Sequence, residues 1–254
     1  MRLDLFLVNQ QLVSSRTQAQ DLIENGFVYL LNKGQKIILK KTSFAVDNVL
    51  TDKIFIEKNP LQKYVSRGGL KLESAIKNLN LNIVGKIVLD VGQSTGGFTD
   101  CLIQNGAERV VGIDVGHGQL HPSLKNNKQI IALEGLHVKD LSTDSNFKSS
   151  VPIDGFNLIV MDVSFISLTK TISFMTPFLK KGGNYLFLVK PQFECGPEHL
   201  DKNGIVKNTT IYTEIAERVK KMALQHFNNV EAYIKSDIIG KDGNQEFFVY
   251  GQKN

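Results

Sequence analysis

The stretch "DVGQSTGGFTD" (residues 90–100) has the pattern of a buried strand that runs into a glycine-lined turn and then into a helix. Such turns often hold nucleotides, because glycine lets the backbone approach a ligand closely. The stretch contains neither the G-x-G-x-x-G of dinucleotide-binding folds nor the G-K-[ST] of phosphate loops. It also lacks lysine and arginine, which a phosphate group would favour, whereas Asp90 suits a ligand with its own positive charge.

From residue 86 onwards, apolar strand-like stretches alternate with segments of helical pattern. This alternation predicts an α/β domain with a mostly parallel sheet covered on both faces, and the end of the chain predicts one added antiparallel strand. Helices are expected at 96–105, near 167–180 and at 209–226. The expected strands are "KIVLDVG" (86–92), "RVVGIDVG" (109–116), "QIIALEG" (129–135), "FNLIVMDVSF" (156–165), "GNYLFLVKPQFE" (183–194), "NVEAYIKS" (229–236) and "EFFVYGQK" (246–253).

Polar residues stand where these strands end, which is where open α/β sheets bind their ligands. The second strand ends at Asp114, in the position of the acidic residue that takes a ribose hydroxyl pair. A nucleoside with a cationic centre and no phosphate is S-adenosylmethionine, which we therefore expect as the cofactor. Asp162 and Lys190 end two later apolar strands. Each alone would be typical of strand-end solvation, but together beside the glycine turn they indicate a site.

The N-terminal quarter of the chain has a different character. Residues 2–12 and 15–25 predict short amphipathic helices, with Ser15 as an N-cap and Gly26 as a stop, and 27–31 and 36–39 predict a hairpin. Residues 1–65 carry nine Lys/Arg against six Asp/Glu, and the remaining residues 21 against 19. This excess favours a polyanionic partner such as RNA, although a solvated polar face is the alternative. The candidate RNA-binding residues of this part are Arg2, Arg16, Lys33 and Lys36.

A joint between the two parts is expected in "IFIEKNPLQKYVSRGG" (54–69), which contains Pro60 and a glycine pair. We predict a small α+β domain at 1–58, a linker at 59–65 and the large α/β domain at 66–254. The helix that opens the large domain has apolar residues on one face and should pack on the sheet.

Several classes of protein are disfavoured by the sequence. No apolar run approaches the ~18–20 residues of a membrane span, and polar residues follow too early for a signal peptide. The two cysteines, Cys101 and Cys195, are far apart and suggest a reducing, cytoplasmic location. His117 and His121 are four residues apart, but no third ligand stands nearby, so we expect no metal.

Six motifs together resemble the TlyA (hemolysin-A-like) family of ribosomal RNA 2′-O-methyltransferases. Residues 2–35 are similar to the small RNA-binding domain first described in ribosomal small-subunit protein S-four. The resemblance covers nearly the whole chain and implies a FtsJ-like, Rossmann-like class I S-adenosylmethionine-dependent methyltransferase domain with a seven-stranded sheet. The motifs are "YVSRGGLKLE" (64–73), "DVGQSTGGFTDCL" (90–102), "DVGHGQL" (114–120), "DVSFISL" (162–168), "KPQFE" (190–194) and "GNQEFF" (243–248).

The resemblance also implies which residues carry the chemistry. A Lys-Asp-Lys-Glu tetrad falls on Lys71, Asp162, Lys190 and Glu246, and Arg67 joins the RNA-binding candidates. The chain departs from the family at Gln93, where a small residue is usual, and at "EGLHVKDL" (134–141), where Glu-x-Thr-Asn-x-Arg is expected; which of residues 134–137 touch the adenine is therefore open. The implied cofactor-binding positions are Asp90, Gly92, Ser94, Thr95, Gly96, Gly97, Phe98 and Asp114.

The expected reaction is methylation of a ribose 2′-hydroxyl, which needs that oxygen positioned and its proton removed. Whether Lys190 removes the proton or only orients the hydroxyl is left open by the sequence. The family points to cytidine in ribosomal RNA, and the start of the chain at the RNA-binding motif favours 23S RNA of the large subunit. A non-catalytic RNA-binding assembly factor is the main alternative, and a pore-forming hemolysin is disfavoured by the lack of a membrane span.

Overall fold

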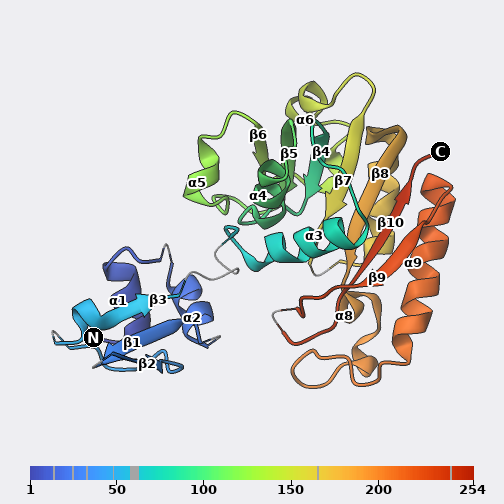
Figure 1. The fold of residues 1–254 in the computed structure, drawn as a ribbon. Coiled ribbons are helices and arrows are strands. Elements are labelled where there is room, and N and C mark those ends of the chain that lie inside the picture. Colours follow the sequence, from blue (N-terminus) through green and yellow to red (C-terminus); the bar gives the residue numbers. More distant parts are fainter. Residues whose placement is uncertain are drawn as a thin grey trace. The chain divides into compact units, whose positions relative to one another are not determined.

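The computed structural model describes residues 1–13, 15–24, 26–32, 34–47, 49–57, 63–164, 166–240 and 242–254. The chain divides into two compact units, Met1–Lys63 and Tyr64–Asn254, called here the N-terminal and C-terminal units (Figure 1). The division falls inside the stretch where the sequence predicts a linker. Residues 58–62 of that stretch lie outside the described residues.

The N-terminal unit packs two helices on a three-stranded antiparallel sheet. Alternate residues of the central strand, Val28 and Leu30, are buried, as expected for a sheet with one covered face. Ser15 Oγ accepts a hydrogen bond from the Gln18 amide at 3.2 Å, and Gly26 follows the second helix with φ +78°, as the sequence predicts. The elements are α1 (Leu3–Asn9), α2 (Arg16–Glu24) and, in the order β2-β1-β3, β2 (Gln35–Ile38), β1 (Val28–Asn32) and β3 (Ile54–Ile56).

The C-terminal unit contains a seven-stranded sheet, which agrees with the predicted mostly parallel α/β fold. One strand, β10, is antiparallel to both of its neighbours. The sequence places this strand at the end of the sheet, whereas the structure inserts it between β8 and β9. The order is β6 (Ile130–Glu134), β5 (Arg109–Asp114), β4 (Ile87–Val91), β7 (Phe156–Met161), β8 (Leu179–Val189), β10 (Phe247–Gln252) and β9 (Ala232–Lys235).

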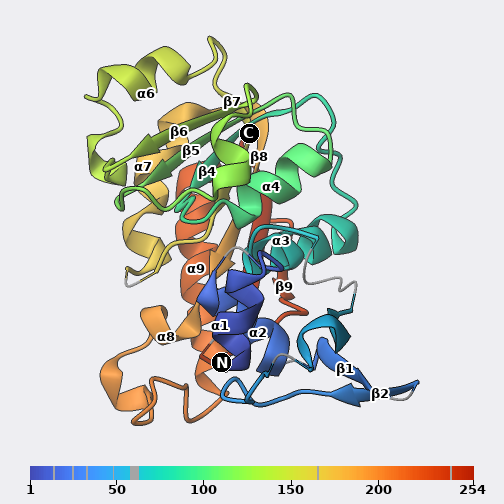
Figure 2. The ribbon, with the colours of Figure 1, turned by 90° about the vertical axis from the view of Figure 1, so that its left-hand side faces the viewer.

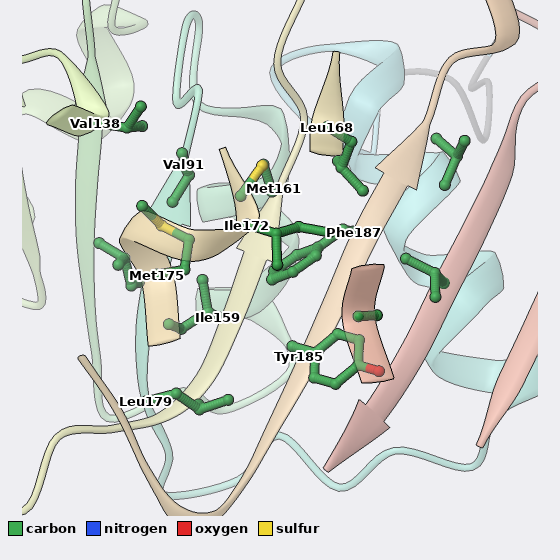
Figure 3. Packing of buried hydrophobic residues seen from close by; sticks show 14 of the residues in the cluster. Val91, Val138, Ile159, Met161, Leu168, Ile172, Met175, Leu179, Tyr185 and Phe187 are labelled. Carbon is green, nitrogen blue, oxygen red and sulfur yellow. The ribbon is translucent and has the colours of Figure 1, made fainter. Parts of the chain in front are cut away.

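Helices cover both faces of this sheet, as Figures 1 and 2 show. Successive strand residues point to opposite faces, so Val88 joins one buried cluster and Leu89 the other. The first cluster includes apolar side chains of α3 (Arg67–Asn78) and α4 (Gly97–Gln104). The second includes those of α6 (Ser145–Ser150), α7 (Ile172–Met175) and α9 (Ile211–Phe227), and Figure 3 shows part of it.

The prediction of a single helix near 167–180 is wrong. Three short pieces replace it, and β8 already begins at Leu179. Pro177 has no N–H to continue a helical ladder, which explains why regular helix stops before it. The pieces are η4 (Leu168–Lys170), α7 and η5 (Thr176–Phe178).

The remaining elements are short connections. They are η1 (Thr51–Lys53), α5 (Pro122–Lys125), η3 (Val138–Asp140), α8 (Pro191–Glu194) and η6 (Pro197–His199).

Throughout the described residues, no helix combines the length and apolar character required to cross a bilayer.

Candidate active site

Two adjoining cavities lie at the carboxyl ends of β4, β5, β7 and β8 in the C-terminal unit. The smaller has a volume of about 170 Å³ and the larger about 640 Å³. They share four lining residues, Gly92, Ser94, Asp162 and Ser164. This is the edge at which open α/β sheets bind ligands, and the strand-end residues predicted from the sequence meet here.

The glycine turn after β4 adopts a backbone that side chains resist. Gly92 has φ +84° and Gly96 has φ +90°, both in the left-handed region that glycine enters without strain. A Cβ atom on Gly92 would lie 2.5 Å from the carbonyl oxygen of Asp162. The turn therefore brings the β4 and β7 loops closer together than any other residue type would allow.

Asp90 lies fully buried beneath this turn. Its Oδ2 accepts a hydrogen bond from Thr99 Oγ1 at 2.6 Å, and Gln93 Nε2 donates to the same hydroxyl at 2.9 Å. Oδ1 has no hydrogen-bond partner among the described residues. Burial raises the pKa of Asp90 to about 7, which the hydrogen bond from Thr99 opposes. Gln93, the departure from the family pattern, thus supports the hydroxyl that holds Asp90.

Asp114 lines the larger cavity at the end of β5. One of its oxygens accepts from the Ser94 amide at 2.8 Å and the other from the Gly116 amide at 2.7 Å. A carboxylate has about four acceptor positions, so both oxygens can still accept from ribose hydroxyls.

Residues 134–137 divide between two tasks. The Glu134 carboxylate accepts from the amides of Gly118 and Gln119 at 2.6 and 3.1 Å, and these bonds lower its pKa. Glu134 therefore shapes the loop after β5 rather than the cavity wall. His137 lines the larger cavity, and its Nδ1 accepts the Lys139 amide at 3.1 Å. In the neutral ring the hydrogen consequently sits on Nε2, which makes Nε2 a donor.

The four residues of the implied tetrad come together as two ion pairs, one buried and one partly buried. Lys71 Nζ lies 2.5 Å from Glu246 Oε2, and Lys190 Nζ lies 2.5 Å from Asp162 Oδ1. Lys190 Nζ also donates to Ser164 Oγ at 2.9 Å. Burial raises the pKa of Glu246, which the charge of Lys71 opposes.

These residues come from four separate elements. Lys71 lies on α3, Asp162 follows β7, Lys190 follows β8 and Glu246 precedes β10. Lys71, Asp162 and Lys190 line the smaller cavity. The candidate cofactor residues Thr95, Gly97 and Phe98 line the same cavity, and Gly96 lies in the turn between them.

Ser66 and Gly68, at the end of the predicted joint, also line the smaller cavity, and sequence reasoning did not assign them to the site. Ser164 was missed in the same way, although it lies inside the quoted motif "DVSFISL". Within the described residues, no group of three His, Cys, Asp or Glu side chains is placed to hold a metal ion.

The candidate RNA-binding residues lie in both units. In the N-terminal unit, Arg2 and Arg16 each point a guanidinium at Asp4, with Nε–Oδ distances of 3.0 and 2.9 Å. The Asp4 side chain is fully buried, while the two arginines are about half exposed. Asp4 was missed by sequence reasoning; its only signal is a carboxylate inside the apolar helix "LDLFLVN".

The other candidates are placed differently. Lys36 pairs with Glu57 at 2.6 Å and lies over the Tyr29 ring, 4.7 Å from its centroid. Lys33 lies outside the described residues. Arg67 belongs to α3 of the C-terminal unit, where it donates to the Ile239 carbonyl at 3.2 Å.

Both units of the chain match known protein families. Residues 64–253 match the FtsJ-like methyltransferase family, and residues 1–30 match the S4 domain. The chain is 37% identical over 254 residues to the "Putative rRNA methyltransferase YqxC" of Bacillus subtilis, covering 98% of this chain and 84% of that protein. It is 37% identical over 266 residues to the "23S rRNA (cytidine-2'-O)-methyltransferase TlyA" of Campylobacter jejuni, covering all of both chains.

A solved structure has the same fold. The "Putative hemolysin from Streptococcus thermophilus" superposes with a TM-score of 0.74 at 33% identity, over 100% of this chain and 88% of that one. The fold class expected from the sequence is therefore confirmed.

Proposed function

The chain belongs to the FtsJ-like methyltransferase family, and from this premise we propose that it transfers the methyl group of S-adenosylmethionine to a ribose 2′-hydroxyl of ribosomal RNA. The observation that carries the proposal is the meeting of the Lys71–Glu246 and Asp162–Lys190 pairs at the cavity that the glycine turn also lines. Binding RNA alone would not require one buried and one partly buried lysine–carboxylate pair beside a nucleoside site.

The residues of the two cavities suit this cofactor. Among residues 90–100 there is no cation to bind a phosphate, and the carboxyl group of the buried Asp90 lies beneath the turn. Asp114 is placed for the ribose diol, and His137 Nε2 can donate to a ring nitrogen of the adenine. When bound, the cofactor supplies an activated methyl group on a sulfonium.

Lys190 is the residue we assign to the acceptor hydroxyl. Its amine is held by Asp162 and Ser164 at the smaller cavity, so it can orient the hydroxyl and, in its neutral form, accept the proton. Lys71 and Glu246 complete the charge balance, because with Asp162 and Lys190 they form two pairs of opposite charge and leave no charge isolated. We assign Asp162, Lys71 and Glu246 to holding Lys190 and the hydroxyl in place.

The N-terminal unit is proposed to grip the RNA. Asp4 holds the guanidinium groups of Arg2 and Arg16 from within while their outer faces stay exposed. Fixing two arginines in advance lowers the entropic cost of binding phosphates. Lys33, Lys36 and Arg67 remain candidates for further RNA contacts.

We propose cytidine in 23S RNA as the substrate. This rests on the name of the Campylobacter jejuni relative, a 23S rRNA (cytidine-2'-O)-methyltransferase that this chain matches over its whole length. Reaction on 16S RNA, and RNA binding without catalysis, are the outcomes that the experiment must separate.

The test is incorporation of tritiated methyl groups into large and small ribosomal subunits that lack the modification, followed by mass mapping of the modified nucleoside. Lys190→Ala should lose methyl transfer by about 100-fold or more, the range for removing a positioned acid–base group. Lys190→Arg should fail almost as badly, since a guanidinium keeps its proton. Lys181→Ala, an exposed lysine on β8, is the matched control.

Cofactor and RNA dissociation constants, measured in parallel, should change little in Lys190→Ala. Wild-type transfer by Lys190→Ala would contradict the assignment. No transfer by the wild-type protein to either subunit, with RNA binding intact, would favour an assembly factor.

A further inference from the structure

The motif "KPQFE" ends in Glu194, a carboxylate that the proposed reaction does not use. Glu194 is the last residue of α8, the short helix that begins directly after Lys190. It is largely withdrawn from solvent, and burial raises its pKa. A partly buried carboxylate at the C-terminal end of a helix is unfavourable in itself, so its partners must offset the cost.

Those partners lie on the loop that follows β7. Glu194 Oε1 accepts the Leu168 amide at 2.6 Å, and Oε2 accepts the Ser167 hydroxyl at 2.7 Å. The Ser167 hydroxyl is in turn 2.7 Å from Thr169 Oγ1. One carboxylate therefore binds both a backbone amide and a side chain of the same loop.

The described residues of this loop, 162–164 and 166–168, include Asp162 and Ser164 of the candidate site. The loop begins with Asp162 and lines both cavities. Its first anchor is Lys190, through the ion pair to Asp162 and the hydrogen bond to Ser164. Its second anchor is Glu194, four residues after Lys190 on the neighbouring segment.

We propose that Glu194 is a positioning residue that braces the 162–168 loop, so that Ser164 and Asp162 stay in register with Lys190. The two loops follow adjacent parallel strands, β7 and β8 (Figure 1), and the brace joins them beyond the last ladder bonds. On α9, Arg218 donates to the Glu194 carbonyl oxygen at 2.5 Å, which fixes α8 from the other side. Glu194 acts through hydrogen bonds rather than through its charge. The inference rests on the proposed function for its catalytic readout only.

Two substitutions separate hydrogen bonding from charge. In Glu194→Gln, the amide oxygen can accept the Leu168 N–H, and the amide nitrogen can donate to Ser167 once that hydroxyl turns toward Thr169. In Glu194→Leu, neither bond can form, and the buried Leu168 amide loses its partner. Glu198→Gln is the matched control, since Glu198 is an exposed glutamate four residues further on.

We expect Glu194→Leu to lower kcat by about tenfold or more while raising the cofactor dissociation constant less than about threefold. Glu194→Gln should stay within about threefold of the wild type in both quantities, and Glu198→Gln should match the wild type. A purely structural role would lower the melting temperature without this split between kcat and binding. Equal damage in Glu194→Gln and Glu194→Leu would overturn the proposal, because it would mean that the charge matters.

Two readouts do not depend on methyl transfer, so failure of the brace and failure of the proposed function remain distinguishable. Hydrogen exchange of the Leu168 amide should accelerate in Glu194→Leu and stay slow in Glu194→Gln. The rate at which an amine-reactive reagent labels Lys190, mapped by mass spectrometry, should rise only in Glu194→Leu. If the exchange rate of the Leu168 amide and the labelling rate of Lys190 are both unchanged in Glu194→Leu, the proposal is wrong, whatever the methyl-transfer activity.

A double mutant tests whether Glu194 acts on the site through Ser164. If Glu194 acts through Ser164, adding Glu194→Leu to Ser164→Ala should cost much less than it costs the wild type. The same tenfold loss in both backgrounds would contradict a brace that works through Ser164.

Discussion

Replacing one member of the Lys71–Glu246 pair should destabilise the C-terminal unit far more than replacing both. Lys71 and Glu246 are only 10% and 3% exposed in their side chains, and Nζ and Oε2 are 2.5 Å apart. Lys71→Met leaves the carboxylate without its cation, and Glu246→Leu leaves the ammonium without its anion. The double substitution puts two apolar side chains of similar size against each other.

The expected magnitudes follow from opposing terms. At an effective dielectric constant of about 20, the attraction of the pair is about 7 kcal/mol, and removing two ions from water costs several kcal/mol each. The pair is therefore close to neutral in net free energy, whereas an orphaned buried charge is costly. Because Asp162 and Lys190 lie nearby and partly compensate, we expect about 3 kcal/mol for each single substitution and about 1 kcal/mol for the double.

The assay is urea unfolding of the full chain followed by far-ultraviolet circular dichroism and tyrosine fluorescence, since the chain has no tryptophan. Coupling of about 5 kcal/mol is expected between the two sites. Single substitutions that each cost under about 1 kcal/mol and add independently in the double mutant would refute the reasoning.

The pH dependence has a definite sign. Burial places the pKa of Glu246 above its ordinary value, so the folded state takes up this proton before the unfolded state as the pH falls. Once Glu246 is protonated it carries no charge, so the loss of the Lys71 ammonium no longer leaves a buried charge unpaired. The stability deficit of Lys71→Met should consequently shrink as the pH falls and Glu246 takes up its proton.

Three further predictions concern the cofactor cavities. Gly92→Ala should weaken S-adenosylhomocysteine binding by about tenfold or more in calorimetry, because the added Cβ would lie 2.5 Å from the carbonyl oxygen of Asp162. Gly85→Ala is the control, since Gly85 also has a positive φ but an added Cβ would meet no atom within 4 Å. It should leave the affinity unchanged and cost only about 1 kcal/mol of stability. Asp90→Asn should melt higher than the wild type at about pH 8, because burial raises the pKa of Asp90 to about 7 and its ionised form costs stability in the folded state. The gap should narrow as the pH falls and close below about pH 4, the ordinary pKa of an aspartate. A wild type more stable at pH 8 would contradict this. His137→Ala should lower the affinity for S-adenosylhomocysteine several-fold, because one hydrogen bond to the ligand is lost. His121→Ala is the control: it removes a similar cap from a short helix outside both cavities and should leave the affinity unchanged.

The strand ends of the parallel sheet were the part of the site that the sequence could predict. Asp90, Asp114, Asp162 and Lys190 follow apolar runs, and parallel strands bring their carboxyl ends to one edge, so their meeting follows from the fold. Glu246 and Lys71 carry no such signal. They are 175 residues apart, and only the resemblance to a family indicated them.

The features that the sequence did not predict depend on contacts between distant segments. The position of β10 between β8 and β9 is set by pairing across the sheet, which no local pattern records. The prediction of one helix near 167–180 was wrong because Pro177 interrupts it. The apolar residues of this segment instead reach a buried cluster from several short helical turns. Asp4 is buried in an apolar helix because Arg2, at the start of that helix, and Arg16, on α2, share its carboxylate.

The interior place of β10 has a consequence for synthesis of the chain. β10 is the last of the sheet's strands to leave the ribosome, yet it must enter between two strands that are already made. Until then the β8 edge is unpaired and Lys71 has no carboxylate from Glu246. A nascent or prematurely terminated chain therefore cannot assemble all four charged residues, and its open strand edge marks it for chaperones and proteases. Synthesis of β10 is thereby a condition for assembling the site.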